Sequence, residues 1–223
     1  GRLVVVSNRV ARPDEPSSGG LAVAMDAALR VHGGLWFGWS GRISTACAAH
    51  IERRGAIGYA TVDLSLAEHQ AYYEQFSNRT LWPLLHSRPS LVDFDSRAFE
   101  GYLDVNRRFA ATLQHLLRAD DTVWVHDYHL IPLGAMLRRL GVHNRIGFFL
   151  HTPLPPEELL ASLPRHRELF GAFAAYDLVG FQTERDLRAF RHYCVDELAA
   201  APGKSVLTVG GRRVVVAAFP IGI

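Results

Sequence analysis

Short runs of apolar, mostly β-branched or aromatic residues recur along the chain and alternate with stretches of helical periodicity. The runs Leu3–Val6, Val123–Val125 and Ile146–Leu150 are short and end abruptly, which predicts buried strands. Leu130–Leu140 lies between the last two runs and has apolar residues at helical spacing, so this part predicts a strand, helix, strand unit. Two strands joined through one helix run parallel, in a sheet that helices cover on both faces.

The rest of the chain repeats this alternation. Further strands are predicted at Ile57–Leu64 and Asp177–Phe181, followed by a hairpin or strand pair around Gly210-Gly211. Ser65 is expected to cap a helix, with Glu68 as its capping-box partner. Other helices are predicted over Leu21–Val31, Phe99–Leu117, Glu157–Leu163, Arg167–Ala175 and Thr183–Leu198. The pattern therefore predicts an α/β fold built on a parallel β-sheet.

Titratable residues stand where two of the predicted strands end. His126-Asp127 follows the second apolar run, and His151 follows the third. In open parallel sheets the ligand crevice lies outside the carboxyl ends of the strands. We therefore expect Asp127 and His151 at a binding or catalytic site, while a helix-capping role for Asp127 and a structural role for His151 stay open as alternatives.

A second candidate feature lies near the first strand. Arg9 follows that strand closely, and its planar guanidinium suits a phosphate group. Gly19-Gly20 opens the predicted helix Leu21–Val31, where glycine lets a ligand approach the backbone and free N–H groups face an anion. Neither a Walker loop nor a dinucleotide fingerprint accompanies these glycines, so an ordinary flexible turn is the alternative.

Aromatic residues gather in two segments. Trp36 and Trp39 belong to a Trp-Phe-Gly-Trp-Ser-Gly stretch, whereas Tyr73 and Trp82 belong to the helix that follows Ser65 and to its end. An aromatic stripe of this kind usually packs in a core. Tyrosine and tryptophan also carry a polar group, so the alternative is a wall that holds a sugar or its phosphate.

Composition narrows the functional class. The chain has 223 residues, 48% of them hydrophobic, and a formal net charge of +2, which argues against nucleic acid or a membrane surface as a partner. Its 11 histidines follow no metal-ligand spacing, so neither a metal nor another cofactor is expected. Cys47 and Cys194 lie too far apart to suggest a disulfide framework, and no transmembrane-length run or signal peptide is evident, so a cytoplasmic location is expected.

The candidate groups suit a phosphorylated polar small molecule such as a sugar phosphate. A carboxylate and an imidazole at strand ends hold hydroxyl groups or move a proton, and an arginine holds a phosphate. No serine or cysteine triad and no paired-carboxylate hydrolase motif is evident in the sequence.

Motifs along the whole chain, in the right order, resemble the amino-terminal half of the trehalose-6-phosphate synthase family. They are LVVVSNR from Leu3, GGLA from Gly19, WFGWSG from Trp36, Tyr73 with FSN from Phe76 and LWP from Leu81, VHDYHL from Val125, IGFFLHTP from Ile146 and GFQT from Gly180. The resemblance implies a GT-B glycosyltransferase, in which two Rossmann-like domains face each other across a cleft. By this resemblance, the chain is expected to correspond to the N-terminal one of these domains.

The resemblance also implies an activity. Members of the family transfer glucose, with retention, from a nucleotide sugar such as UDP-glucose to glucose 6-phosphate, giving trehalose 6-phosphate. By resemblance, the acceptor-binding residues are Arg9, Tyr73, Trp82 and Asp127. His151 is expected to hydrogen-bond the donor glucose, Gly20 to lie against the donor phosphates, and Asp127 and His151 to be the catalytic candidates. The family is thought to use no metal and no protein nucleophile, so that the leaving phosphate takes the acceptor proton.

The family's chain is about twice as long as this one, which is typical of a two-domain enzyme. We therefore expect residues 1–223 to form an acceptor-side Rossmann-like domain without the nucleotide-sugar-binding domain, and to be inactive alone. An open cleft surface makes a homo-oligomer a further hypothesis. Two alternatives stay open: a related retaining glucosyltransferase with another acceptor, and a non-catalytic sugar-phosphate-binding module.

Overall fold

The computed structural model describes residues 1–10, 25, 27–31, 33–45 and 49–220. Its strands are β1 (Leu3–Arg9), β2 (Gly34–Ile43), β3 (Ala49–Arg54), β4 (Ile57–Leu64), β5 (Thr122–His126), β6 (Arg145–Leu150), β7 (Leu178–Phe181), β8 (Ala201–Pro202), β9 (Val206–Val209) and β10 (Arg212–Ala218). Its helices are α2 (Leu66–Glu68), η1 (His69–Leu81), α3 (Trp82–Leu85), η2 (Pro89–Leu91), α4 (Ser96–Gln114), η3 (Tyr128–Leu130), α5 (Leu133–Arg139), α6 (Glu157–Ala161), α7 (His166–Gly171), η4 (Ala172–Ala175) and α8 (Glu184–Leu198). No helix among these residues is long and apolar enough to cross a membrane.

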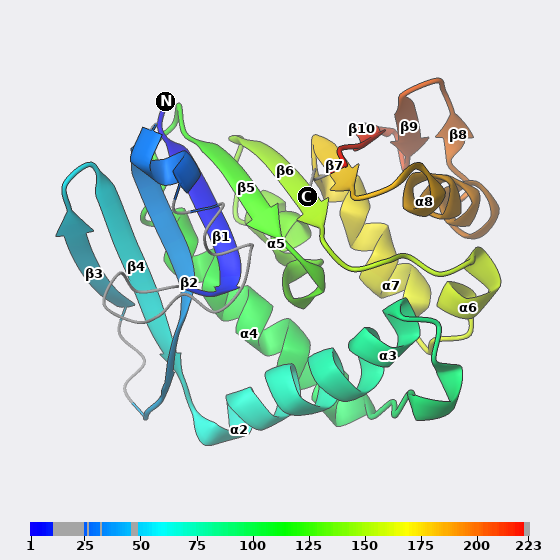
Figure 1. Cartoon of the computed structure of the whole chain (residues 1–223), viewed down its shortest axis with the longest axis horizontal. Coiled ribbons are helices and arrows are strands. Elements are labelled where there is room, and N and C mark those ends of the chain that lie inside the picture. The colour runs from blue at the N-terminus through cyan, green and yellow to red at the C-terminus, as the bar shows by residue number, and fades with distance from the viewer. Residues whose placement is uncertain (11–24, 26, 32, 46–48, 221–223) are drawn as a thin grey trace.

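All described strands belong to one sheet, in the order β3-β4-β2-β1-β5-β6-β7-β10-β9-β8 (Figure 1). The strands from β4 to β10 in this order run parallel to their neighbours. The strands at the two edges are antiparallel, and the pair β9 and β10 forms the hairpin predicted around Gly210-Gly211. The predicted parallel sheet of an α/β fold is confirmed, with antiparallel strands added at its edges.

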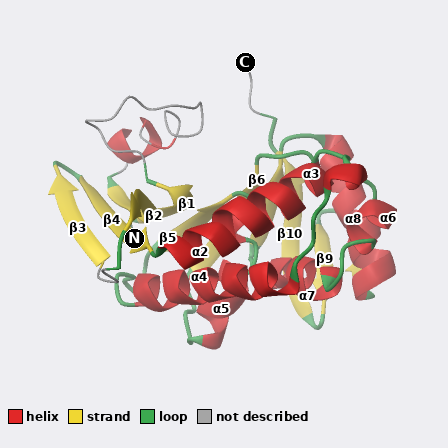
Figure 2. Ribbon diagram, turned by 90° about the horizontal axis from the view of Figure 1, so that it is seen from below, coloured by secondary structure: helices red, strands yellow, loops and turns green. Residues whose placement is uncertain are grey.

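Apolar side chains on the two faces of the sheet form two separate cores. Val4 and Val6 of β1 belong to the larger core, which α4 and α5 complete, whereas Val5 belongs to a smaller one. The smaller core also contains Met25 and Leu29, which are helical residues of the predicted helix Leu21–Val31. Figure 2 shows this short helical segment and the pair α4 and α5 on opposite sides of the strands. Because successive strand residues point to opposite faces, each core takes alternate residues of β1.

The order of the strands reverses at β1. The chain passes from β1 to β2 and β4 on one side, and then returns to β5 on the other side of β1. In open α/β sheets this reversal leaves a crevice outside the carboxyl ends of the central strands. Figure 1 shows the continuous run of α2, η1 and α3 crossing below those ends. The fold therefore places β1, β5 and β6 so that their last residues face η1 and α3.

The helix after β4 begins as predicted but winds differently. The Ser65 side chain accepts a hydrogen bond from the Glu68 N–H, and the Glu68 carboxylate accepts one from the Ser65 N–H, so the capping box is present. From His69 the backbone is a π-helix over 13 residues. π-helical segments are rare and frequently accompany functional sites. The sequence pattern predicted a helix here but not its type, because side-chain type does not reveal the wider hydrogen-bond spacing.

The aromatic-glycine segment forms a strand that the apolar pattern did not predict. Residues Gly34–Ile43 pair with β1 and β4 as β2. A side chain at Gly38 would place its Cβ 2.2 Å from the Ser7 carbonyl oxygen, so glycine is needed for the close approach of β1. Glycines interrupt the β-branched run that marks a strand, which explains why the pattern missed it.

The hydroxyl of Tyr176 holds the start of α5 in place. It accepts a hydrogen bond from the Gly134 N–H at 3.0 Å and lies 2.9 Å from the Leu130 carbonyl oxygen, to which it can donate. Tyr176 is fully buried, so water cannot replace these bonds. We expect Tyr176→Phe to lower the free energy of unfolding by about 1–3 kcal/mol in urea titrations, the range for leaving buried polar groups unpaired.

The control for this prediction is Tyr193→Phe. The Tyr193 hydroxyl lies 2.9 Å from His166 Nδ1, a side chain that is 18% exposed. Water can therefore serve His166 once the hydroxyl is gone, and the loss should be smaller than for Tyr176→Phe. Equal losses in the two variants would show that the Tyr176 hydroxyl has no special role in holding α5.

Candidate active site

The predicted site residues gather at the carboxyl ends of the central strands. Arg9 ends β1, Asp127 follows β5, and His151 follows β6. The Asp127 N–H donates to the Phe149 carbonyl at 2.9 Å, so β5 and β6 stay paired up to the point where the site begins. Since β1 pairs with β5 and β5 with β6, these strand ends form one continuous rim.

Asp127 sits in a strained backbone conformation. Its φ is 71° and its ψ is 167°, a region that only glycine occupies without cost. The carboxylate accepts a hydrogen bond from the Tyr128 N–H at 3.0 Å and lies 3.4 Å from the His151 N–H. Asp127 therefore caps the short helix η3 and also reaches the end of β6. A helix-capping role for Asp127 is therefore confirmed, but the capped helix is η3 and not the predicted helix Leu130–Leu140.

The environment of Asp127 raises the pKa of its carboxyl group to about 6, chiefly because burial disfavours the charged form. Hydrogen bonds from the Tyr128, His151 and Thr152 N–H groups and the charge of His86 oppose this increase. Near neutral pH the carboxylate is therefore mostly ionised but close to its pKa. Such a group accepts hydrogen bonds from hydroxyls and exchanges a proton readily.

His126 and His151, which follow each other across the ends of β5 and β6, form a pair. Their Nδ1 and Nε2 atoms are 3.0 Å apart and their rings are stacked. Burial lowers the pKa of His126 to about 3 and that of His151 to about 4, and the charge of His151 lowers the pKa of His126 further. Both imidazoles are therefore neutral at pH 7. His126 itself is fully buried, so it belongs to the interior of the domain.

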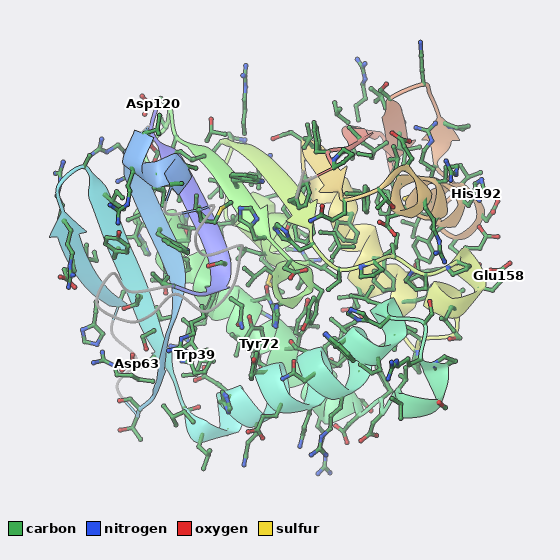
Figure 3. All side chains as sticks on the ribbon, viewed as in Figure 1. Trp39, Asp63, Tyr72, Asp120, Glu158 and His192 are labelled. Atoms are coloured by element: carbon green, nitrogen blue, oxygen red, sulfur yellow. The ribbon has the colours of Figure 1, made fainter. Side chains whose placement is uncertain are left out.

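Aromatic side chains of β2 and η1 line the same side of the sheet. The Tyr73 ring is stacked on His129 at a centroid distance of 5.8 Å and lies 5.8 Å from the Trp39 ring. The Tyr72 hydroxyl hydrogen-bonds Asn8 Oδ1 at 2.9 Å, which ties η1 to the end of β1. Figure 3 shows Trp39 and Tyr72 between the sheet and η1. Tyr73 is held by packing, yet it remains half-buried.

The two tryptophans of β2 are core residues. Trp36 is 2% exposed and its indole N–H donates to Ser7 Oγ at 2.8 Å. Trp39 is 7% exposed, and its indole N–H donates to the Arg42 carbonyl. Core packing, the first of the two interpretations of this segment, is therefore confirmed for both rings. Trp39 reaches the site indirectly, as the surface against which Tyr73 rests.

Trp82 presents its indole to solvent at the other end of η1. It is 41% exposed and is stacked on the ring of His86 at a centroid distance of 4.1 Å. His86 Nδ1 lies 2.7 Å from the Trp82 carbonyl oxygen, so this nitrogen carries a proton and donates it. The charge of His86 lowers the pKa of the Asp127 carboxyl group, so the two side chains interact electrostatically. His86 was not predicted from the sequence, although its four-residue spacing from Trp82 on one helix face was visible.

Arg9 is an exposed residue whose guanidinium lies against Gly41. A Cβ at Gly41 would approach Arg9 Nε to 2.6 Å, and Gly41 has a φ of 84°. Glycine is therefore favoured at this position within β2 by its positive φ, and a side chain there would displace the guanidinium of Arg9. Gly20, the candidate for the donor phosphates, lies outside the described residues.

The fold thus places the predicted site residues at the carboxyl ends of the central strands and on the helical run that crosses these ends. They are Arg9, Asp127 and His151 at the strand ends, and Tyr73 and Trp82 on the helical run. Within the described part of the chain no cluster of histidine, cysteine or carboxylate side chains is arranged to hold a metal ion. The charges are mixed, with a guanidinium at the end of β1 and a carboxylate just after β5. Such an arrangement can bind a small molecule that carries both an anionic group and several hydroxyls.

Comparison with known proteins agrees with the predicted family and fold. The model of glycosyltransferase family 20 matches residues 6–223. Trehalose-6-phosphate synthases from Klebsiella pneumoniae and Escherichia coli are 48% and 46% identical over all of this chain, which spans about half (48%) of their length. A Burkholderia xenovorans trehalose-phosphate synthase solved with glucose 6-phosphate has a TM-score of 0.94 at 48% identity, with all of this chain and 50% of that chain covered. An Escherichia coli structure with bound UDP-2-fluoro glucose has a TM-score of 0.94 at 44% identity and covers 100% of this chain and 49% of that one.

Proposed function

The chain belongs to glycosyltransferase family 20, and from that premise we propose that it is the acceptor-side part of a trehalose-6-phosphate synthase. In this proposal residues 1–223 form the N-terminal Rossmann-like domain of a GT-B enzyme, and a nucleotide-sugar-binding domain of similar size completes the cleft. The proposal is supported by the relatives, of which this chain spans about half. The donor is a nucleotide glucose such as UDP-glucose, and the acceptor is glucose 6-phosphate.

The observation that carries the proposal is the position of a guanidinium and a strained carboxylate at the carboxyl ends of the neighbouring strands β1 and β5, where the strand order of the sheet reverses. Arg9 offers two parallel N–H donors to the acceptor phosphate, and Tyr73 and Trp82 complete its surroundings with aromatic faces and polar groups. Asp127 accepts hydrogen bonds from the acceptor hydroxyls and so fixes the reacting one. His151, on the next strand, holds the donor glucose, and Gly20 the donor phosphates.

The reaction in this proposal exchanges one bond for another at the anomeric carbon of the donor glucose. The bond from that carbon to the nucleotide phosphate breaks, and a bond to the acceptor hydroxyl oxygen forms on the same face. The hydroxyl proton passes to the leaving phosphate. The contribution of this chain is to hold the acceptor so that its hydroxyl lies beside the bond that breaks. No protein nucleophile is required.

Three further predictions from the sequence remain part of this proposal. The isolated chain is expected to be inactive, because the groups that face the leaving phosphate belong to the other domain. A cytoplasmic location is expected for an enzyme that uses nucleotide sugars. Self-association through the open edge of the site also remains a hypothesis, which the molecular mass in solution tests directly.

Calorimetric titration with glucose 6-phosphate tests the proposed acceptor site. We expect saturable binding in the millimolar range, since half of the cleft supplies part of the contacts, and a loss of at least about tenfold in Arg9→Ala. The loss follows from removing a charge-assisted bidentate contact, worth about 1.5–3 kcal/mol. Plain glucose should bind more weakly than the phosphate ester.

The matched control is Arg213→Ala, which removes an equal charge from an exposed position on β10. It should leave the affinity unchanged. Equal losses of affinity in the two variants would mean that Arg9 contributes only its positive charge and no direct contact with the phosphate. Stronger binding of another phosphorylated acceptor would favour the related glucosyltransferase, and binding without any transfer in a completed two-domain protein would favour the non-catalytic module.

A further inference from the structure

The strand ends hold two imidazoles in direct contact. His126, the last residue of β5, and His151, which follows β6, have Nδ1 and Nε2 atoms 3.0 Å apart. Their ring centroids are 5.3 Å apart and the ring planes differ by 29°. The neighbouring rings of Trp124, 4.3 Å from His126, and Phe149, 4.7 Å from His151, confine the pair on both sides. The two nitrogens therefore share one hydrogen bond.

A hydrogen bond between two neutral imidazoles contains one proton. Either His126 Nδ1–H donates to the lone pair of His151 Nε2, or His151 Nε2–H donates to the lone pair of His126 Nδ1. Each choice fixes the other nitrogen of both rings, because a neutral imidazole carries a single N–H. The choice consequently decides whether His151 Nδ1 is a donor or an acceptor.

The surroundings of His126 decide between these arrangements. Its Nε2 atom is buried and has no hydrogen-bond partner among the residues that the structure describes. If His151 were the donor in the pair, His126 would carry its proton on this Nε2 atom, as a buried N–H with no acceptor. If His126 is the donor, Nε2 is a bare lone pair. Buried N–H groups without a partner are rarer in proteins than underused acceptors, so His126 is the donor.

We propose that His126 is a positioning residue that holds His151 as its Nδ1–H tautomer, so that His151 meets the ligand with an N–H donor. The inference rests on the proposed function for the identity of that ligand, a hydroxyl group of the donor glucose. It also limits the chemistry of His151. While the pair is intact, neither of its ring nitrogens has an available lone pair, so His151 binds a hydroxyl oxygen and does not act as a general base.

The sequence places these residues by strand register. His126 pairs with Phe149 across β5 and β6, two residues before His151, and the Asp127 N–H continues the ladder by donating to the Phe149 carbonyl. His126 occupies the same face of β5 as Trp124, because residues two apart share a face. The ladder thus brings the two imidazoles together without any contribution from a ligand.

Nitrogen-15 NMR of the intact chain at pH 7.5 tests the inference without any ligand. In the parent protein we expect His151 to be predominantly the Nδ1–H tautomer. In His126→Phe the ring is kept but both nitrogens are lost, and His151 should change to predominantly Nε2–H, the form that a histidine without a fixed partner prefers. In His126→Asn the amide N–H replaces the Nδ1–H donor, and the Nδ1–H tautomer of His151 should return.

A parent protein in which His151 is predominantly Nε2–H would overturn the inference, whatever the variants do. An unchanged Nδ1–H tautomer in a folded His126→Phe protein would overturn it too, because another group would then be setting the proton. Circular dichroism of each variant checks the fold. The NMR experiment contains no sugar, so titration of the same samples with glucose 6-phosphate tests the proposed function independently. If the parent protein did not bind glucose 6-phosphate, this result would count against the proposed function only.

Discussion

Replacing Asp127 with glycine is expected to stabilise this domain while removing the role in glucosyl transfer that we propose for Asp127. The backbone of Asp127 lies at φ 71° and ψ 167°, where a side chain costs about 1–3 kcal/mol and glycine costs almost nothing. Urea unfolding at pH 7.5 should therefore show Asp127→Gly to be about 1–3 kcal/mol more stable than the parent. Most substitutions destabilise a protein, so an increase would be informative in itself.

Two further effects act on the stability of this variant in opposite directions. The pKa of the Asp127 carboxyl is raised to about 6, so ionisation at pH 7.5 costs the folded state free energy that the variant recovers. Partial exposure of the side chain to solvent reduces this gain. The variant also loses the hydrogen bond to the Tyr128 N–H, worth about 1 kcal/mol for a helix cap. These two effects roughly offset each other, which leaves the backbone strain to set the sign.

The loss of function should be measured in a two-domain protein. The Escherichia coli synthase is 46% identical to this chain over the matched region. A fusion of residues 1–223 with the carboxyl-terminal half of that enzyme would supply the second side of the proposed cleft. We expect transfer to glucose 6-phosphate in this fusion and none in the isolated chain. Asp127→Gly should lower kcat/KM of the fusion by about 10²–10³-fold, the range for removing one well-placed group at a reacting centre.

Ala199→Gly is the matched control. Ala199 has a φ of 52° at the end of α8, so glycine should relieve backbone strain there as well. The control should therefore gain stability and keep full activity in the fusion. If Asp127→Gly were less stable than the parent, the relief of backbone strain would be smaller than the loss of the helix cap. If it kept normal activity, Asp127 would have no role at the reaction centre.

The position of Asp127 is predictable from the sequence, whereas its strained backbone is not. The strands β5 and β6 were predicted because β-branched runs identify buried strands, and the chain must turn sharply where these runs end. Asp127 and His151 were predicted as site residues from that position alone. The backbone conformation of Asp127 was not predictable, because nothing in the residue type requires a glycine-like φ.

Other features were missed because they depend on contacts between distant segments. The strand β2 contains Gly38, which packs against the Ser7 backbone, and a glycine there is understood only once β1 is beside it. The π-helical winding of His69–Leu81 and the effect of His86 on Asp127 arise from the packing of η1 and α3 over the strand ends. Local sequence patterns contain no information on such contacts. These contacts between distant segments concentrate at the candidate site.

Acid is expected to unfold this domain steeply, because neutral imidazoles are buried at its centre. The pKa values of His126 and His129 are lowered to about 3 and that of His151 to about 4, whereas unfolded histidine titrates near 6.5. Between pH 6 and 4 the unfolded chain therefore binds protons that the folded chain does not. Asp127 acts in the opposite direction, since its folded pKa of about 6 lies above the unfolded value of 3.8.

The directions of these pKa shifts determine how steeply the stability falls with pH. A lowered histidine pKa contributes stability that is complete above pH 6.5 and is lost as the pH falls. The raised pKa of Asp127 adds stability as the pH falls below 6. The three histidines and the one carboxyl leave a net uptake of about two protons on unfolding, so stability should fall by up to about 3 kcal/mol per pH unit. Exposure of His151 and Asp127 to solvent makes this an upper value.

His129→Phe separates these contributions. Both ring nitrogens of His129 are buried without a partner among the described residues, and its ring packs against Tyr73 and Tyr128, so a phenyl ring suits the site. Urea unfolding from pH 7.5 to 4.5 should show a slope smaller by about one proton, or about 1.4 kcal/mol per pH unit. His143→Gln, at an exposed position, should leave the slope unchanged. An unaltered slope in His129→Phe would mean that His129 is protonated in the folded state at acid pH, and that the centre of the domain admits water.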